Sequence, residues 1–355
     1  MGIAVGEGNS DSRLRVALTS KNSCKSDGLR GLALCNLNCI YALTLNSHDW
    51  GYPTKVKKEI PKIVILLATY NGVKFIDQQL TSLITQTDVQ IEIHANDDGS
   101  TDGTLERLHH WKEEGWIKTL TQSEHIGATR AFLKLLGECQ SDGPVAFCDQ
   151  DDVWARDKLI SQINSLENDK PMLVFTSRQF IDSLGNSIDA PKEKTFSPSF
   201  LNALVENIVP GNSLLLNDMA VALIQKYKYP EVTHYDSWIY LLVSAHGECK
   251  YISRELVKYR IHEKNSVGLR KNNLEAFISS AKNYGEQAKY FRSVVNVDLP
   301  RESIVELNRM ISIFEGRSSF KRVMSVLKLQ LRRQHFSDRL GFRMILLLGV
   351  ITKKF

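Results

Sequence analysis

The feature that most constrains this chain is a repeated alternation of short apolar runs with segments of helical periodicity. Residues 63–68 form a continuous apolar run, β-branched at its start, which is typical of a strand buried on both faces. Apolar side chains at helical spacing follow over 75–86. The alternation continues with strands expected at 90–95, 117–121 and 144–148 and helices expected from 101 or 102 to about 114 and over 128–139. It predicts an α/β fold with a mostly parallel central sheet flanked by helices.

The chain separates into three regions. Residues 1–58 are rich in Ser, Asn and Gly and lack the basic and apolar start of a signal peptide. We expect a loosely ordered extension or a start codon assigned too early, and the alternative is an N-terminal anchor. Residues 59–270 hold the α/β domain, with further strands expected at 172–177, 214–216 and 256–259, a helix at 236–245, and a loop or hairpin at 182–200. Residues 271–355 form a helical C-terminal region, with the helical pattern starting at Leu274.

Composition excludes several classes of protein. With 43% hydrophobic and 24% charged residues, the 355-residue chain is ordinary globular protein, and its net charge of +5 gives no reason to expect nucleic acid as a partner. The six cysteines include no C-x-x-C pair, so neither a zinc site nor a disulfide framework is expected. No apolar run reaches the roughly 18–20 residues of a membrane span, and the glycine motifs of dinucleotide-binding and phosphate-loop enzymes are absent.

Polar clusters follow three of the expected strands. They are Thr69-Tyr70-Asn71, Asp97-Asp98 and Asp149-Gln150-Asp151-Asp152. Because ligands bind beyond the carboxyl ends of the strands in open parallel sheets, we expect these clusters to meet at one edge. Neighbouring carboxylates repel one another unless a cation joins them, and their oxygens suit Mg²⁺ or Mn²⁺, which in turn bind phosphates. The alternative for the last cluster is an acidic helix N-terminus.

Five motifs fall in order along the chain. They are Thr69-Tyr70-Asn71-Gly72, Asp97-Asp98-Gly99-Ser100-Thr101-Asp102, Cys148-Asp149-Gln150-Asp151-Asp152-Val153-Trp154, Asp236-Ser237-Trp238, and Tyr259-Arg260-Ile261-His262 followed by Asn265-Ser266-Val267-Gly268. Together they resemble glycosyltransferase family 2, the inverting enzymes of the GT-A fold, and the third motif is similar to the rhamnosyltransferase-like branch. The resemblance covers about residues 60–270 and implies the GT-A fold for them.

The resemblance implies a role for each matching residue. Those that would bind a nucleotide-diphospho-sugar donor are Thr69, Tyr70, Asn71, Asp97, Asp98, Asp149 and Arg260. Within this set, Asp98 or Asp97 would face the base or ribose, and Arg260 would be either an anion partner or a loop anchor. Those that would hold a Mg²⁺ or Mn²⁺ ion on the diphosphate are Asp151, His262 and Asp149.

Asp236 is the residue that the resemblance makes the general base. A carboxylate beside the acceptor hydroxyl would take its proton as the oxygen attacks the anomeric carbon, which gives single displacement with inversion. The alternative role for Asp236 is a helix cap. The chain departs from the branch just before this residue, where Tyr235 replaces a common His and His234 lies one residue earlier.

The chain is strongly basic from Gly316 onward. Its only acid there is Asp338, and apolar residues interleave with Lys and Arg up to the nearly wholly apolar segment 344–351. A basic amphipathic segment predicts contact with an anionic membrane surface. The alternative is a helix that packs on the domain and exposes a solvated basic face.

The resemblance therefore implies a glycosyltransferase, which we expect to be cytoplasmic, and the basic tail fits a peripheral enzyme at the inner face of the cell membrane. It would transfer a sugar to a hydroxyl of a surface-polysaccharide or lipid-linked glycan. The branch suggests dTDP-L-rhamnose as donor, and UDP-linked hexoses stay open. Two other classes stay open as well. A nucleotidyltransferase would show a basic, Gly-rich loop after the first strand, and a non-catalytic sugar-nucleotide-binding assembly protein would lose the base or one acid of the D-x-D pair.

Overall fold

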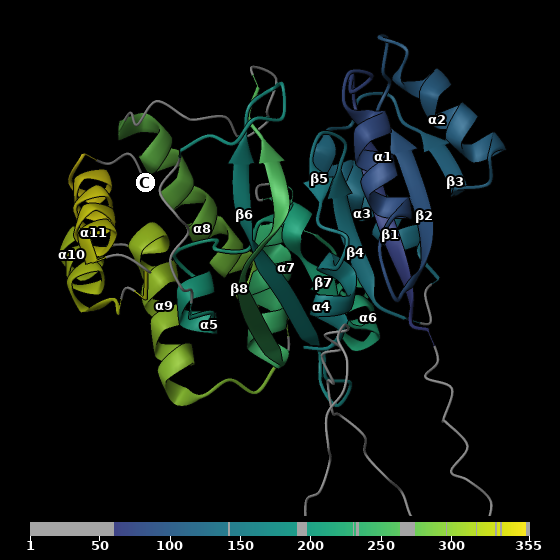
Figure 1. Ribbon diagram of the computed structural model, residues 1–355. Helices are drawn as coiled ribbons and strands as arrows, with labels where there is room; N and C mark the ends of the chain where they lie inside the picture. The colour runs from purple at the N-terminus through teal and green to yellow at the C-terminus, as the bar shows by residue number, and fades with distance from the viewer. Residues whose placement is uncertain are drawn as a thin grey trace, which may run out of the picture. The chain divides into compact units, whose positions relative to one another are not determined.

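A computed structural model describes residues 60–140, 143–189, 197–229, 231, 234–262, 274–295, 297–316, 318–330, 332–333 and 336–352. The strands form one sheet in the order β3-β2-β1-β4-β7-β6-β8-β5 (Figure 1). They are β1 (Lys62–Thr69), β2 (Gln90–Asp97), β3 (Ile117–Gln122), β4 (Val145–Asp149), β5 (Val153–Trp154), β6 (Met172–Ile181), β7 (Leu215–Leu216) and β8 (Glu248–Arg260). The expected extension at 1–58, the expected boundary at 270/271 and the motif at 265–268 lie outside the described residues.

The sheet is parallel over most of its width. β1 pairs in parallel with β2 and β4, and β2 pairs in parallel with β3. The two-residue β7 is antiparallel to both β4 and β6, so β6 and its parallel neighbour β8 run in the same direction as β1 to β4. The short β5 is antiparallel to β8. This arrangement confirms the predicted α/β fold with a mostly parallel sheet.

Helices cover both faces of the sheet because side chains alternate along each strand. In β1, Ile63 and Ile65 pack with residues of α1 (Ile76–Ile84), α2 (Thr104–Glu113) and α4 (Lys158–Ile163). Val64 and Leu66 pack with residues of α3 (Ala128–Glu138) and α7 (Tyr235–His246). The first strand is thus buried on both faces, as its continuous apolar run predicted. The helices are α1 (Ile76–Ile84), α2 (Thr104–Glu113), α3 (Ala128–Glu138), α4 (Lys158–Ile163), α5 (Phe200–Ala203), the 3-10 turn η1 (Gly211–Ser213), α6 (Asp218–Lys226), α7 (Tyr235–His246), α8 (Leu274–Val294), α9 (Arg301–Glu315), α10 (Ser319–Lys328) and α11 (Phe336–Ile351).

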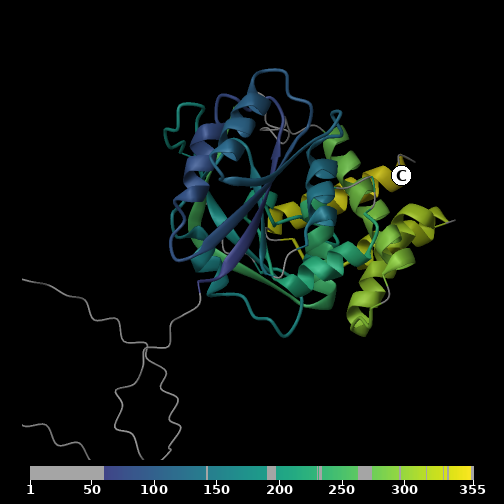
Figure 2. The ribbon, with the colours of Figure 1, turned by 90° about the vertical axis from the view of Figure 1, so that its right-hand side faces the viewer.

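The C-terminal helices α8 to α11 extend the core on the α7 side of the sheet. Figure 2 shows them in green and yellow, across the sheet from the purple-blue α1. Phe291 of α8, Met310 of α9, Val326 of α10 and Leu346 of α11 are buried in the same cluster as Trp238 of α7. No helix among the described residues is both long enough and apolar enough to cross a membrane.

Several elements differ from the sequence-based expectation. The strand expected to stop at residue 177 continues as β6 to Ile181, and the strand expected at 256–259 is the last part of β8, which begins at Glu248. Helices α4, α5 and α6 were not predicted. Helix α2 begins at Thr104 after its N-cap Gly103, and Asp102 Oδ1 accepts a hydrogen bond from Thr104 N at 3.1 Å without occupying the cap position.

Candidate active site

Three parallel strands end together at one edge of the sheet. Thr69, the last residue of β1, pairs with Asp97 at the end of β2, and Ala68 pairs with Asp149 at the end of β4. The polar clusters that follow these strands are therefore neighbours, as the sequence predicted.

The loops after β1 and β2 are bound to each other by their own polar side chains. The buried Asp97 carboxylate accepts hydrogen bonds from Thr69 Oγ1 at 2.9 Å and from Ser100 N at 2.8 Å. Asn71 N donates to Ser100 Oγ at 2.8 Å, and Asn71 Oδ1 accepts from Thr101 N at 2.9 Å. Asn71 has a φ of 49°, a left-handed conformation that Asn tolerates better than most residues. These contacts hold the two loops in place, and a role in donor binding stays a prediction for Thr69, Asn71 and Asp97.

Asp98 fixes the loop that follows β3. Its buried carboxylate accepts hydrogen bonds from Ile126 N and Gly127 N, both at 2.7 Å. In the same loop, the His125 ring lies against the ring of Tyr70, with centroids 4.2 Å apart, and Tyr70 is 42% exposed. An exposed aromatic pair is a surface on which a nucleotide base can stack. Sequence reasoning had noted His125 only as part of a connection, because no motif includes it.

The loop that follows β4, Asp149-Gln150-Asp151-Asp152, is an acidic loop at this edge of the sheet. Asp149 is partly exposed, and its pKa lies well above its usual range. Desolvation by the surrounding protein is the main cause, and the nearby carboxylates of Asp152, Asp151 and Asp236 add to it. A cation among these carboxylates would relieve their repulsion.

Asp151 and His262 are brought together from distant parts of the chain. His262 Nε2 lies 2.8 Å from Asp151 Oδ2. Both side chains are partly exposed. The His262 ring also packs on Phe75, with centroids 5.1 Å apart, which fixes its position beside the acidic loop.

Asp152 and Arg260 are buried and hold the acidic loop in place from the interior of the protein. The buried Asp152 carboxylate accepts hydrogen bonds from Asn212 Nδ2 and from Arg260 N, and burial raises its pKa to about 7 with a further contribution from Asp151. The Arg260 guanidinium is buried as well and donates to Asp151 O at 2.8 Å and to Gln78 Oε1 at 2.6 Å. These are the contacts of a loop anchor, the second of the two roles considered for Arg260, and donor binding by this residue stays a prediction.

Asp236 lies in the first turn of α7. His234 holds the N-cap position, so the carboxylate of Asp236 is not the cap of this helix. Asp236 Oδ1 accepts a hydrogen bond from Ser237 N at 2.7 Å, and Asn207 and Gly211 also donate to the carboxylate. Burial raises the pKa of Asp236, and the positive charge of His234 opposes this effect. A partly exposed carboxylate with a raised pKa, close to Asp149, is suited to accept a proton.

Comparison with known proteins identifies the family of this chain. Residues 64–260 match the family model described as glycosyl transferase family 2. The chain belongs to glycosyltransferase family 2. This family 2 chain is 26% identical to the dTDP-rhamnosyl transferase RfbG of Shigella flexneri in an alignment of 219 residues. The alignment covers 57% of this chain and 73% of RfbG. It is 24% identical over 261 residues to an uncharacterized glycosyltransferase of Rickettsia bellii, over 72% of this chain and only 37% of that longer protein.

Two solved structures share the fold of the family 2 chain. One is TarS 1–349 of S. aureus in complex with UDP-GlcNAc, with a TM-score of 0.53 at 16% identity over 82% of this chain and 81% of that chain. The other is the mannosyltransferase PcManGT of Pyrobaculum calidifontis in complex with GDP-Man and Mn²⁺, with a TM-score of 0.51 at 14% identity over 84% of this chain and 89% of that chain. The predicted GT-A fold is confirmed.

Three further residues of this family 2 chain shape the site, although no role was predicted for them from the sequence: Gly211, Tyr235 and Arg178. A Cβ atom on Gly211 would lie 1.9 Å from the Tyr235 hydroxyl, so only glycine leaves room for this ring next to Asp236. Tyr235 is held in turn by stacking on Phe147, with centroids 5.2 Å apart. Arg178 of β6 lies over the Tyr259 ring at 4.9 Å, and its charge lowers the pKa of Asp149 against the effect of burial. No local pattern marks Arg178, because β6 was expected to end one residue before it.

Proposed function

We propose that this chain transfers one sugar, with inversion, from a nucleotide-diphospho-sugar to a hydroxyl group of a glycan or lipid-linked glycan. The observation that carries the proposal is the position of Asp236 beside the acidic loop at the carboxyl ends of β1 and β4. Membership of glycosyltransferase family 2 supports it.

Asp236 supplies the base of the proposed reaction. Its carboxylate takes the proton of the acceptor hydroxyl while the hydroxyl oxygen forms a bond to the anomeric carbon. The bond from the anomeric carbon to the diphosphate oxygen breaks at the same time, and its electron pair leaves with the nucleoside diphosphate. Because a single displacement needs no covalent intermediate, one carboxylate is sufficient for the proton transfer.

A divalent ion fits the chemistry of Asp151 and His262. A carboxylate oxygen and an imidazole nitrogen lie 2.8 Å apart there, and both side chains are partly exposed. The described residues contain no group of three or more His, Cys, Asp or Glu side chains placed to hold a metal, so diphosphate oxygens would complete the coordination, as is common for Mg²⁺. Asp151 and His262 would hold the ion, and Asp149, the third ligand expected from the sequence, would lie near it. When bound, the ion would neutralise charge on the departing diphosphate.

The identity of the donor and the contacts of its nucleobase are narrower proposals. We infer that dTDP-L-rhamnose is the first donor to test, because RfbG, with which the chain shares 26% identity, is named a dTDP-rhamnosyl transferase. The exposed rings of Tyr70 and His125 would stack on the nucleobase of the donor. The carboxylates of Asp97 and Asp98 would hold in position the loops that carry these two rings.

Association with the membrane surface is a further part of the proposal. On α11 the exposed apolar residues recur at helical spacing and form one stripe: Leu340, Met344, Leu348 and Ile351. Lys328 of α10 and Arg339 of α11 are exposed on the same pair of helices. An apolar stripe with basic neighbours favours an anionic lipid surface, where an enzyme of lipid-linked glycans would meet its acceptor.

Release of nucleoside diphosphate tests the proposed function. The full chain would be incubated with dTDP-rhamnose, UDP-glucose, UDP-galactose, UDP-GlcNAc and GDP-mannose, each with Mn²⁺ or with EDTA. We expect slow release from one donor, through transfer to water, only with Mn²⁺, and proton NMR at early times should show a sugar of inverted anomeric configuration. Binding of a donor without any release would favour the non-catalytic assembly protein.

A further inference from the structure

The side chain of Gln150 joins the acidic loop to the loop that follows β1. Its Oε1 atom accepts a hydrogen bond from Tyr70 N at 2.8 Å, and its Nε2 atom donates to Tyr70 O at 2.9 Å. One carboxamide thus pairs both backbone polar groups of Tyr70 across 80 residues of sequence. The motif that contains Asp149 and Asp151 predicted no role for the glutamine between them.

The backbone of Tyr70 needs this contact because β1 ends one residue earlier. Thr69 is the last residue of β1 that pairs with β2, so the N–H and C=O of Tyr70 lie beyond the hydrogen bonds of the sheet. Asn71, which follows, has a φ of 49° and so belongs to neither a strand nor a right-handed helix. A side chain that binds the N–H and the C=O of Tyr70 together therefore fixes the direction in which its ring leaves the sheet edge.

Gly72 leaves the space in which the Gln150 carboxamide lies. A Cβ atom at this position would overlap with Oε1 and Cδ of Gln150. The backbone of Gly72 has an anchor of its own, because Gly72 N donates to Thr104 Oγ1 at 2.8 Å. A side chain at position 72 would therefore displace the glutamine and leave the backbone where it is.

The two parts that Gln150 joins are each held by further contacts. In the acidic loop, Arg260 Nε donates to Asp151 O at 2.8 Å, so the ion site keeps an anchor without the glutamine. In the loop after β1, the exposed Tyr70 ring lies against the His125 ring, with centroids 4.2 Å apart. The contact of Gln150 thus sets the aromatic surface relative to the ion site.

We propose that Gln150 is a positioning residue, which holds the Tyr70 ring where the nucleobase of a donor reaches it while the diphosphate of the same donor lies at the ion. The inference rests on the proposed function, because it needs Tyr70 to stack on the nucleobase and Asp151 to hold the ion. The ribose and diphosphate that join the two ends of a donor have a limited length. A ring that leaves its place therefore loses the stacking contact although the ion site is intact.

The test is a double-mutant cycle between Gln150 and Tyr70 in the full chain. The variants are Gln150→Met, which keeps the length of the side chain and removes both hydrogen bonds, Tyr70→Ala, and the two combined. Gly72→Ala displaces the carboxamide and leaves Gln150 itself unchanged. Gln90→Met is the matched control, because Gln90 is exposed at the start of β2, the end of this strand opposite to the site.

Calorimetry in Mn²⁺ measures the affinity of each protein for two kinds of ligand. The first is a set of nucleotide sugars: dTDP-rhamnose, UDP-glucose, UDP-galactose, UDP-GlcNAc and GDP-mannose. The second is inorganic pyrophosphate, which offers a diphosphate to the ion site without a nucleobase. The cycle alone decides if pyrophosphate binds the wild type too weakly to measure.

For the nucleotide sugar that the wild type binds, we expect Gln150→Met and Tyr70→Ala each to weaken the affinity about tenfold, which is typical of the loss of one base stacked on an aromatic ring. The double variant should bind no more weakly than Tyr70→Ala, because the glutamine acts through the ring. Gly72→Ala should resemble Gln150→Met, and Gln90→Met should resemble the wild type. Affinity for pyrophosphate should stay within about twofold in all variants.

Three results would overturn the inference. The first is wild-type affinity for the nucleotide sugar in Gln150→Met, and the second is a double variant in which the two losses of affinity add. The third is an equal loss of pyrophosphate and nucleotide-sugar binding in Gln150→Met, because the glutamine would then support the acidic loop alone. If Gln150→Met does not fold, Gly72→Ala takes its place in the cycle. Failure of the proposed function looks different: the wild type then binds no nucleotide sugar, and the inference falls with it.

Discussion

The Nε2 atom of His262 lies 2.8 Å from Oδ2 of Asp151. This contact joins the end of β8 to the loop after β4, two segments that are 111 residues apart in the sequence. Phe75 supports the His262 ring on one side, and the buried Arg260 guanidinium donates to the backbone of Asp151. The pair is therefore held in place before any ligand arrives, and it supplies one oxygen and one nitrogen donor to the same point in space.

Replacing Asp151 should remove metal-dependent binding of the donor. In Asp151→Asn the charge that attracts the ion is lost, so we expect the affinity for a nucleotide sugar in Mn²⁺ to fall to the level that the wild type shows in EDTA. Calorimetry measures both. Asp157→Asn is the matched control, because Asp157 pairs with Arg254 through a largely exposed ion pair outside the acidic loop. Full metal-dependent affinity in Asp151→Asn would place the ion elsewhere.

Replacing Asp236 should separate chemistry from donor binding. Asp236→Asn keeps the size of the side chain but cannot take a proton, so kcat should fall by about 100- to 10,000-fold, the usual contribution of a general base. The donor affinity should stay within about twofold, because no donor contact is assigned to this residue. Release of nucleoside diphosphate gives kcat and calorimetry gives the affinity. Wild-type turnover in Asp236→Asn would remove Asp236 from the reaction.

The pH dependence of kcat should report the environment of Asp236. The base is active when deprotonated, and burial raises its pKa, so kcat should fall on acidification at a higher pH than for an ordinary carboxylate. The positive charge of His234 lowers this pKa. His234→Gln removes that charge, so the acidic midpoint of the kcat profile should move to higher pH. A midpoint that moves to lower pH would contradict this assignment, and saturating donor and acceptor keep binding effects out of the measurement.

Gly211 should tolerate no side chain. A Cβ atom would meet the Tyr235 hydroxyl at 1.9 Å, and the Tyr235 ring cannot yield easily because it stacks on Phe147. Gly211→Ala should therefore lower the free energy of unfolding by about 1–3 kcal/mol and reduce kcat by displacing Asp236. Gly137→Ala is the control, because its Cβ would meet nothing within 4 Å in α3 and should stabilise the helix by about 1 kcal/mol. Urea unfolding distinguishes the two, and equal stability of both variants would contradict the packing described.

The apolar stripe of α11 should control binding to anionic membranes. The double variant Met344→Glu, Leu348→Glu should reduce co-sedimentation with phosphatidylglycerol-containing vesicles about tenfold, because charge in the stripe opposes insertion. Leu184→Glu is the matched control, since Leu184 is 81% exposed and belongs to the turn after β6, not to α11. Equal sedimentation of all three proteins, or no sedimentation of the wild type, would favour a helix whose basic face is only solvated.

The part of the fold that the sequence predicted well is the part with continuous apolar runs. Strands β1 to β4 lie within about two residues of their expected positions. β1 and β4 are buried at nearly every position, and such a continuous apolar run is a distinctive pattern. β2 and β3 are only partly buried. The first eight residues of β8 were missed because partly buried positions alternate irregularly there with exposed ones such as Arg254 and Glu255. Helix α4 was missed because six residues are too few to show a helical period.

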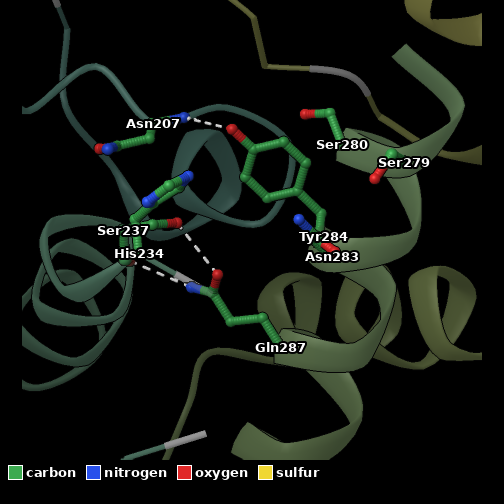
Figure 3. A pocket seen from close by; sticks show the side chains of 8 residues that line it. All are labelled: Asn207, His234, Ser237, Ser279, Ser280, Asn283, Tyr284 and Gln287. Carbon is green, nitrogen blue, oxygen red and sulfur yellow. Dashed lines mark hydrogen bonds between the residues drawn. The ribbon is translucent and has the colours of Figure 1, made fainter. Parts of the chain in front are cut away.

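The candidate site was predicted in its residues but not in their contacts. Motif residues do gather at one edge of the sheet, because parallel strands end there together. The sequence could not show that Asp97 would bind Thr69, or that Arg260 would be buried as an anchor, since these contacts depend on packing between distant segments. A polar cavity between α7 and α8, lined among others by His234, Ser237 and Asn283 (Figure 3), was not foreseen for the same reason: polar residues on a helix carry no signal of what they face.

The measurement that tests the central claim most directly is calorimetric titration of the full chain with dTDP-rhamnose, UDP-glucose and UDP-galactose, each in Mn²⁺ and in EDTA. The account predicts that one nucleotide sugar binds in Mn²⁺ and that its affinity drops at least tenfold in EDTA. Equal affinity in both buffers would contradict the metal site at Asp151 and His262. Absence of binding by folded protein, across these donors and then UDP-GlcNAc and GDP-mannose, would contradict the proposed donor class.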